Sequence, residues 1–156
     1  MDILKLYRRL EDKPAGKWLF SKLVCWKAPY FGSIAPRIVD LSAERGVARI
    51  AHHRRVSNHI GTVHAIALCN LAEFVGGLAC DAGTPAGMRW IPKGMQVEYL
   101  KKAMGTMTAV ATPAFAPRVA EAGYALPYDI SVTDPQGVEV FRARIDMWLS
   151  PKAGRA

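Results

Sequence analysis

The chain has 156 residues, of which 51% are hydrophobic and 22% charged. This composition fits one domain with a packed core and excludes wholesale disorder, a large barrel and a two-domain enzyme. Lys and Arg number 21 against 13 Asp and Glu, a formal net charge of +8. Such a balance favours an anionic partner: nucleic acid, a membrane surface or a phosphate-bearing small molecule.

The cysteines and the lack of a long apolar segment both bear on where the protein is located. Cys25, Cys69 and Cys80 form no CxxC pair, which disfavours a disulfide framework and a thiolate zinc site. The first ten residues contain acids and bases where a signal peptide needs an apolar segment. No segment reaches the roughly 20 apolar residues that a transmembrane helix needs. We therefore expect a cytoplasmic protein without a transmembrane segment.

Residues 1–32 are expected to form an N-terminal helical extension. Apolar side chains within residues 3–10 and within residues 19–24 recur at helical spacing. The second segment also has tryptophans beside lysines, a combination typical of helices that lie on a membrane surface. Packing of this helix on the rest of the domain is the interpretation we prefer.

Residues 33–150 are predicted to form a single domain. Strand-like segments are expected at 34–42, 46–53, 88–92, 95–102, 106–112, 124–132 and 138–149. Residues 63–80 are almost entirely apolar and predict one continuous helix that is buried on nearly all sides. The fold class is therefore α+β, with an antiparallel sheet of about six strands wrapped around one long buried helix. Residues 151–156 are expected to be a loose tail.

Glu73 is the residue that packing alone does not explain. It lies in the middle of the predicted buried helix, and no Lys or Arg stands within one helical turn of it. A buried carboxylate is costly unless it is paired or faces a wet cavity or a partner chain. Desolvated carboxylates suit general-base or nucleophilic work, so Glu73 is a candidate catalytic group. A structural carboxylate that caps a buried backbone group is the alternative.

A second concentration of polar residues, 58–64, leads directly into the predicted helix. Backbone N–H groups at a helix N-terminus are unpaired and carry partial positive charge, so they can hold an oxyanion or a phosphate. Gly61 allows the backbone to approach a ligand closely, and Asn58 and His64 supply donors. The alternative is that Asn58 and Thr62 only cap the helix.

The pattern Asn58-x-x-Gly61-x-x-His64, followed nine residues after the histidine by Glu73, resembles the active-site segment of hotdog-fold acyl-CoA thioesterases. The PaaI-like branch is the most similar, beside a neighbouring uncharacterised hotdog family. The resemblance implies that Glu73 attacks the thioester or activates a water, and that the Ala65 N–H stabilises the oxyanion. It implies that Asn58 and His64 orient the substrate or support the loop. It also implies a homodimer or a dimer of dimers with sites at the subunit interface.

The resemblance further implies an acyl-CoA or acyl-carrier thioester as substrate, with no cofactor beyond the coenzyme A of that substrate. Gly61, Ala65 and His59 are the candidates for oxyanion and substrate binding. Basic pairs that suit the phosphates of coenzyme A are Arg54, Arg55, Arg142 and Arg144. No HExxH motif or Cys/His ligand spacing is present, so we expect no metal.

Two positions depart from the family pattern. Ala65 stands where the family has glycine, and Phe74 stands where a small hydroxyl residue is common. Both departures favour an alternative function, a non-catalytic hotdog module that binds an acyl or aromatic ligand. A hotdog dehydratase is less well supported, because residues 60–62 lack the Pro-Gly-rich loop usual in those enzymes. A nucleic-acid partner rests only on the net charge, and we expect none.

Overall fold

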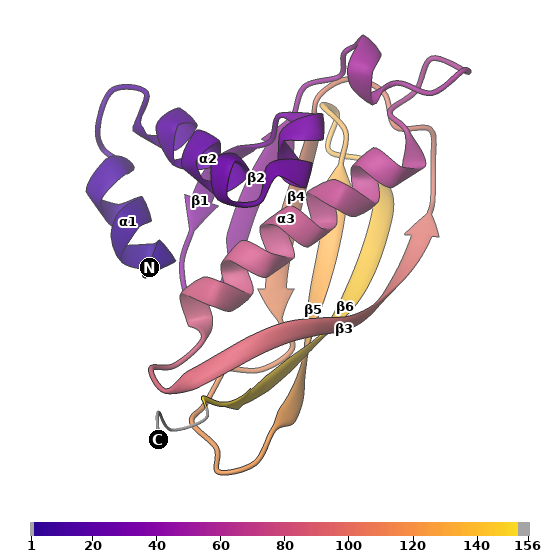
Figure 1. Cartoon of the computed structure of the whole chain (residues 1–156). Coiled ribbons are helices and arrows are strands. Elements are labelled where there is room, and N and C mark those ends of the chain that lie inside the picture. The colour runs from indigo at the N-terminus through magenta and orange to yellow at the C-terminus, as the bar shows by residue number, and fades with distance from the viewer. Residues whose placement is uncertain (1, 153–156) are drawn as a thin grey trace.

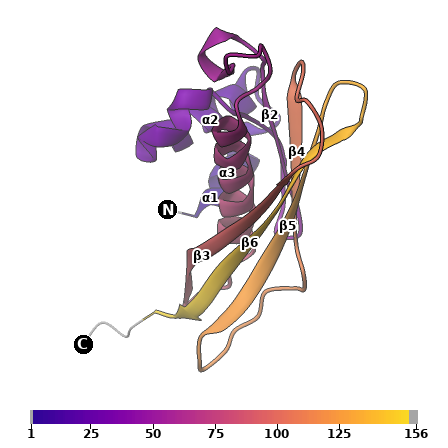
Figure 2. The ribbon, with the colours of Figure 1, turned by 90° about the vertical axis from the view of Figure 1, so that its right-hand side faces the viewer.

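A curved six-stranded antiparallel sheet carries the main helix on its concave face (Figure 1). The computed structural model describes residues 2–152. The strands are β1 (Arg37–Leu41), β2 (Gly46–Ile50), β3 (Met88–Tyr99), β4 (Met107–Pro113), β5 (Tyr124–Thr133) and β6 (Glu139–Pro151). Their order in the sheet is β1-β2-β4-β5-β6-β3, so β1 and β3 form its two edges. The side view shows the sheet on one side and the helices on the other (Figure 2).

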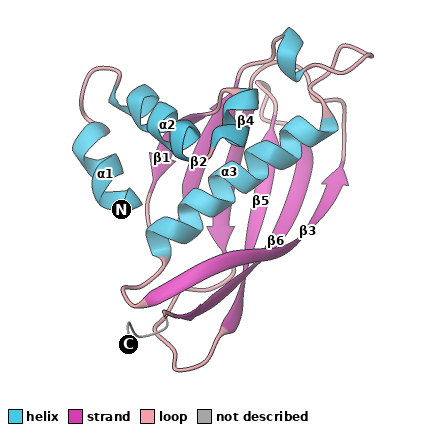
Figure 3. Cartoon of the chain, viewed as in Figure 1, coloured by secondary structure: helices cyan, strands magenta, loops and turns pink. Residues whose placement is uncertain are grey.

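The helices lie in the N-terminal segment and in the long apolar segment, as predicted, apart from one short helix in the loop before the apolar segment (Figure 3). They are α1 (Ile3–Leu10), α2 (Gly16–Lys27), the 3₁₀ helices η1 (Pro29–Ile34) and η2 (Arg54–Val56), and α3 (Ala65–Gly83). The continuous helix expected at 63–80 is thus confirmed as α3, displaced by two or three residues. Its N-cap is His64 rather than Thr62, because the His64 side chain accepts a hydrogen bond from the Ile66 N–H.

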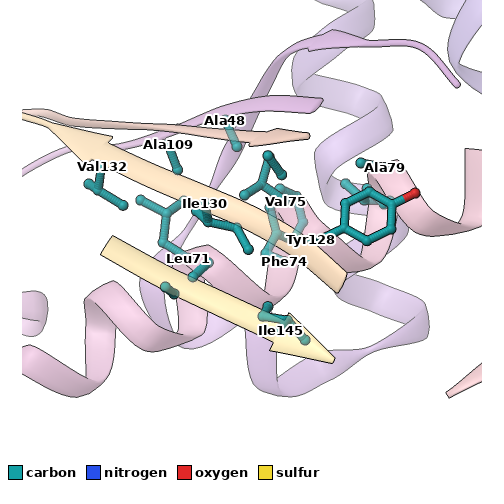
Figure 4. Packing of buried hydrophobic residues seen from close by; sticks show 14 of the residues in the cluster. Ala48, Leu71, Phe74, Val75, Ala79, Ala109, Tyr128, Ile130, Val132 and Ile145 are labelled. Carbon is teal, nitrogen blue, oxygen red and sulfur yellow. The ribbon is translucent and has the colours of Figure 1, made fainter. Parts of the chain in front are cut away.

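The core lies between α3 and the concave face of the sheet (Figure 4). Leu71, Phe74 and Val75 of α3 are at most 1% exposed, and each such buried side chain contributes roughly 1.5–3 kcal/mol. Close approach depends on Gly76, where an added Cβ would lie 3.2 Å from Cδ1 of Ile145. A glycine at this position therefore permits the close approach of helix and sheet.

The expectation that α3 is buried on nearly all sides is wrong for the single chain. The sheet covers one side of the helix and the N-terminal segments pack against part of another. A stripe of α3 stays open, and its residues are Ile66, Cys69, Glu73, Gly77 and Asp81. Glu73 is exposed, so its carboxylate carries no burial cost within one chain. The expectation from composition fails because Ile66, Cys69 and Gly77 are nonpolar residues that lie on this stripe and not in the core.

The N-terminal helices cover the outer edge of β1. Ser21 Oγ of α2 accepts a hydrogen bond from the Ile38 N–H at 2.9 Å, and Lys17 Nζ donates to the carbonyl of Val39 at 2.7 Å. The rings of Tyr7 and Phe20 meet edge to face with centroids 5.3 Å apart. The edge of the sheet is thereby satisfied by side chains, which prevents further strand pairing there.

The long strand β3 joins two segments that the sequence pattern separates. A bulge between Pro92 and Gly94 absorbs the break, so that one strand pairs with β6 along its whole length. Of the tail expected to be loose, Pro151 ends β6 and the Lys152 N–H donates to the carbonyl of Gly87. Residues 153–156 lie outside the described residues.

One helix in residues 2–152, α3, is long and apolar enough to cross a membrane by composition. Its most apolar window is 61% buried within the fold. That degree of burial is typical of the core helix of a globular domain, which passes the same test of length and apolar content.

Replacing Phe74 by alanine tests the core assignment. Phe74 is 1% exposed and packs edge to face on Phe31 with centroids 5.4 Å apart. Phe74→Ala is expected to lower the free energy of unfolding by about 3–5 kcal/mol, because it leaves a cavity under α3. Urea denaturation measures this loss. The control Phe115→Ala removes a ring that is 42% exposed and is expected to cost less than about 1 kcal/mol. Equal costs at the two sites would contradict the packing.

Candidate functional site

The loop before α3 is closed by the side chain of Asn58. Its Oδ1 accepts hydrogen bonds from the N–H groups of Ile60 at 3.2 Å and Thr62 at 3.0 Å, and its Nδ2 donates to Thr62 Oγ1 at 2.8 Å. Gly61 adopts φ +79° at the tip, where no atom would meet an added Cβ within 4 Å. The Asn58 amide is therefore occupied in shaping the loop, and His59 and Gly61 are left exposed at its tip.

The start of α3 offers a free backbone donor. The His64 N–H donates to the carbonyl of Val56 at 2.8 Å, and His64 Nδ1 accepts from the Ile66 N–H at 3.1 Å. Within residues 2–152 the Ala65 N–H has no hydrogen-bond acceptor. As the first residue of a 19-residue helix, Ala65 presents this N–H at the positive end of the helix dipole, which suits a developing oxyanion.

Glu73 lies on the open stripe of α3 between two contacts with β3. One turn before it, Cys69 Sγ shares a hydrogen bond of 3.3 Å with the hydroxyl of Tyr99. One turn after it, the indole of Trp90 lies against Gly77 and donates to Asp81 Oδ1 at 3.0 Å. Glu73 itself forms no ion pair among residues 2–152. Its carboxylate is therefore unpaired and open to solvent.

Tyr99 is a residue of this region that the sequence does not single out. The hydrogen bond to Cys69, followed by burial, raises the pKa of Tyr99 to about 12. The phenol therefore stays protonated at physiological pH and remains a hydrogen-bond partner on β3, beside the open stripe of α3. Strand alternation puts Val97 and Tyr99 on one face, but only the tertiary structure shows that this face meets Cys69.

The catalytic candidates do not come together within one chain. Glu73 follows Ala65 by eight residues, and a rise of about 1.5 Å per residue separates them by about 12 Å along the helix axis. A reacting carbonyl group must lie about 3 Å from both the attacking group and the oxyanion donor. One copy of α3 therefore cannot supply both groups to the same substrate.

The four candidate arginines divide into two locations. Arg54 and Arg55 lie in η2, exposed and next to the loop that precedes α3. Arg142 and Arg144 lie on the outer face of β6, away from α3, where they pair with Glu139 and Asp129. The guanidinium of Arg142 and the hydroxyl of Ser131 hold the pKa of the Glu139 carboxyl below its usual value.

The side chain of His52 serves the local structure before α3. His52 Nδ1 accepts a hydrogen bond from the Gly105 N–H at 3.1 Å, and its Nε2 lies 3.1 Å from Ser57 Oγ. Across residues 2–152 no group of three or more His, Cys, Asp or Glu side chains has an arrangement suited to a metal ion.

Comparisons with known proteins identify one family and several similar structures. The model of a family described as a domain of unknown function, DUF4442, matches residues 16–149. A structural-genomics crystal structure designated APC5556 is 40% identical, with a TM-score of 0.81 over 96% of this chain and 99% of that one. Thioesterase HI1161 from Haemophilus influenzae is 16% identical, with a TM-score of 0.72 over 86% and 91% of the two chains.

A third similar structure is PA5026 from Pseudomonas aeruginosa, a protein named a probable thioesterase. It is 21% identical, with a TM-score of 0.76 over 90% of this chain and 97% of that one. The comparison with curated proteins gave no match. The likeness to HI1161 and PA5026 confirms the hotdog fold predicted from the sequence.

A series at position 58 tests the role of Asn58 in the loop. Asn58→Ala removes three side-chain hydrogen bonds and is expected to lower the free energy of unfolding by about 1–3 kcal/mol. Asn58→Asp keeps both acceptor bonds and is expected to lose less. The exposed neighbour His59→Ala serves as the control and should change stability by less than about 0.5 kcal/mol. Equal stability of all three variants in thermal melts would show that the loop does not depend on Asn58.

Proposed function

We propose that this chain, which belongs to the DUF4442 family, hydrolyses a thioester of coenzyme A or of an acyl carrier. The observation that carries the proposal is that α3 has both an unpartnered N–H at its start and an unpaired carboxylate on its open stripe. These are the two groups that thioester hydrolysis needs. The thioesterase names of HI1161 and PA5026 support the same reaction class.

The site is proposed to form between two copies of the chain. The edge of β3 opposite β6 has no strand partner in the sheet, and long exposed edges favour pairing with another strand. Large apolar side chains around this edge and the start of α3 are exposed: Ile60, Ile66, Ile91, Met95, Tyr99, Leu100 and Met104. Their burial in a homodimer brings two open stripes together. The Ala65 N–H of one chain then lies near the carboxylate that its partner supplies.

The proposed reaction follows from these two groups. The thioester carbonyl oxygen accepts a hydrogen bond from the Ala65 N–H, which stabilises the negative charge that develops on it. The Glu73 carboxylate either attacks the carbonyl carbon or removes a proton from an attacking water. When Glu73 attacks, the C–S bond breaks, the thiolate leaves with the electron pair and takes up a proton, and water then hydrolyses the acyl–Glu73 anhydride to the free acid and the Glu73 carboxylate. When Glu73 acts as a base, the hydroxide of the activated water bonds to the carbonyl carbon, the C–S bond breaks, the thiolate takes up the proton held by Glu73, and the acid is released directly. This chemistry requires neither a metal nor a cofactor.

The two departures from the family pattern spare the reacting groups. The methyl group of Ala65 leaves its backbone N–H in place, since only proline lacks that donor. Phe74 is buried against Phe31, so its ring points into the core and not toward the open stripe that carries Glu73. Both observations favour catalysis over a module that only binds its ligand.

Other candidates take supporting positions in this proposal. Asn58 acts as a positioning residue through the loop, and His64 holds the first turn of α3. Gly61 and His59 lie where the substrate approaches. Arg54 and Arg55 are the better candidates for the phosphates of coenzyme A, because they lie at the N-terminal end of α3 and have no carboxylate partner among the described residues.

Replacing Glu73 by glutamine tests the proposal directly. Glu73→Gln is expected to lower hydrolysis of acyl-CoA by at least about a hundredfold, because both mechanisms need the ionised carboxylate. Because Glu73 has no ion-pair partner, stability should change by less than about 0.5 kcal/mol. The matched control is Glu121→Gln, an exposed acid outside the site. A screen over short, medium, long and aromatic acyl groups measures both variants. Full activity of Glu73→Gln, or no hydrolysis by the parent protein, would contradict the proposal.

A further inference from the structure

The solvent-facing side of α2 is unusually apolar for an exposed helix. Leu19, Leu23 and Trp26 recur at i, i+4 and i+7, so they form one stripe along the helix. Trp26 is 84% exposed, and Leu19 and Leu23 are 42% and 36% exposed. Tyr30, at the start of η1, is 71% exposed and follows Trp26 by four residues. The buried face of α2, with Phe20 and Val24, is a separate face that already packs on the domain.

The charges around this stripe are all positive. Residues 13–39 contain four lysines and Arg37, and no Asp or Glu. Lys22 lies next to the stripe and Lys27 ends the helix, while Lys17 is on the opposite side of α2, where its Nζ donates to the carbonyl of Val39. An apolar stripe of Leu and Trp with flanking lysines is the pattern by which helices lie in the headgroup region of a membrane.

A groove of about 740 Å³ extends this positive surface from α2 onto the sheet. It is lined by Lys17, Trp18, Lys22, Arg37, Arg49 and His53, among other residues. Arg37 and Arg49 are direct cross-strand partners on β1 and β2, and like charges in that position are destabilising. The three ion pairs within residues 2–152 all lie elsewhere. Arg49 Nε donates to Thr108 Oγ1 at 3.1 Å, and among the described residues neither arginine has a carboxylate partner. A ligand that supplies negative charge would relieve this like-charge pair.

We infer that the stripe of α2 and the adjoining basic groove dock this protein on an anionic phospholipid surface. Leu19, Leu23 and Trp26 enter the headgroup region, while Arg37 and Arg49 hold lipid phosphates. A second copy of this chain is disfavoured as the occupant, because two such faces would bring lysines against lysines. The inference does not rest on the proposed hydrolysis, since it uses neither α3 nor β3.

Vesicle co-sedimentation of the full chain tests this inference. The protein is expected to sediment with phosphatidylcholine vesicles that contain phosphatidylglycerol and not with phosphatidylcholine alone, and to be released as salt is raised. Leu23→Ser/Trp26→Ser is expected to weaken binding at least about tenfold. Arg37→Gln/Arg49→Gln is expected to weaken it roughly thirtyfold, without loss of thermal stability, because it relieves a like-charge pair.

Two control variants remove similar side chains from other parts of the surface. Val119→Ser removes an apolar side chain that is 71% exposed elsewhere, and Lys101→Gln/Lys102→Gln removes two exposed charges; both should bind like the parent. Failure to bind anionic vesicles, or unchanged binding by the stripe variant, would overturn the inference. A lower mass of that variant in light scattering would instead assign the stripe to contacts between copies. Release by millimolar inorganic phosphate would assign the groove to a soluble phosphate ligand. The lower mass and the release by phosphate would each overturn membrane docking.

Discussion

The packing of α3 against the concave face of the sheet is the constraint on which the other features depend. Gly76 lets the helix approach Ile145, and Gly46 of β2 leaves room for Val75. Because one side of α3 is committed to the sheet, the opposite stripe has a fixed direction toward β3 and solvent. The placement of Glu73 is a consequence of this packing. Any reaction at the stripe is therefore performed by a carboxylate on a rigid core helix, which holds it more firmly than a loop would.

The same packing sets the direction in which the N-terminus of α3 points. Asn58 closes the preceding loop, and the hydrogen bond from His64 to Val56 fixes where the helix begins. The helix dipole and the Ala65 N–H then act at one end of α3, while Glu73 lies in its middle. This separation is the reason for proposing a site shared between two chains, because antiparallel packing of two such helices would place the start of one beside the middle of the other.

Much of the fold was predictable from sequence because its signals are local. Residues 3–10 have helical periodicity, and residues 63–80 are almost entirely apolar over the length of a helix. The bulge at Pro92 was missed, because proline normally argues against an interior strand position and only pairing with β6 restores the register. The exposure of Glu73 was also missed. Apolar composition indicates that a helix is covered, but it does not say whether its own chain or a partner covers each face.

The sequence proposes residues for the site, and the structure adds the contacts that those residues make. Spacing selected Asn58, His64 and Glu73, yet the side-chain bonds of Asn58 assign it to the loop. Tyr99 and the pair Arg37 and Arg49 depend on contacts between segments far apart in sequence, and no local pattern marks them. Such contacts are set by sheet register, which a one-residue shift would reverse.

Ala65→Pro offers a clean way to test whether the site is shared between chains. Proline is favoured at the first position of a helix, and His64 has the extended conformation, φ −64° and ψ 139°, that a following proline requires. The substitution therefore removes the N–H donor while α3 is expected to keep its fold.

The most direct measurement is the activity of a mixture of Ala65→Pro and Glu73→Gln chains, denatured and refolded together. Each variant alone is expected to be inactive. If Ala65 of one chain works with Glu73 of its partner, every mixed dimer contains one intact site, and random pairing restores about a quarter of the parental thioesterase activity. Refolding that yields stable dimers without any recovered activity would contradict a site built from two chains.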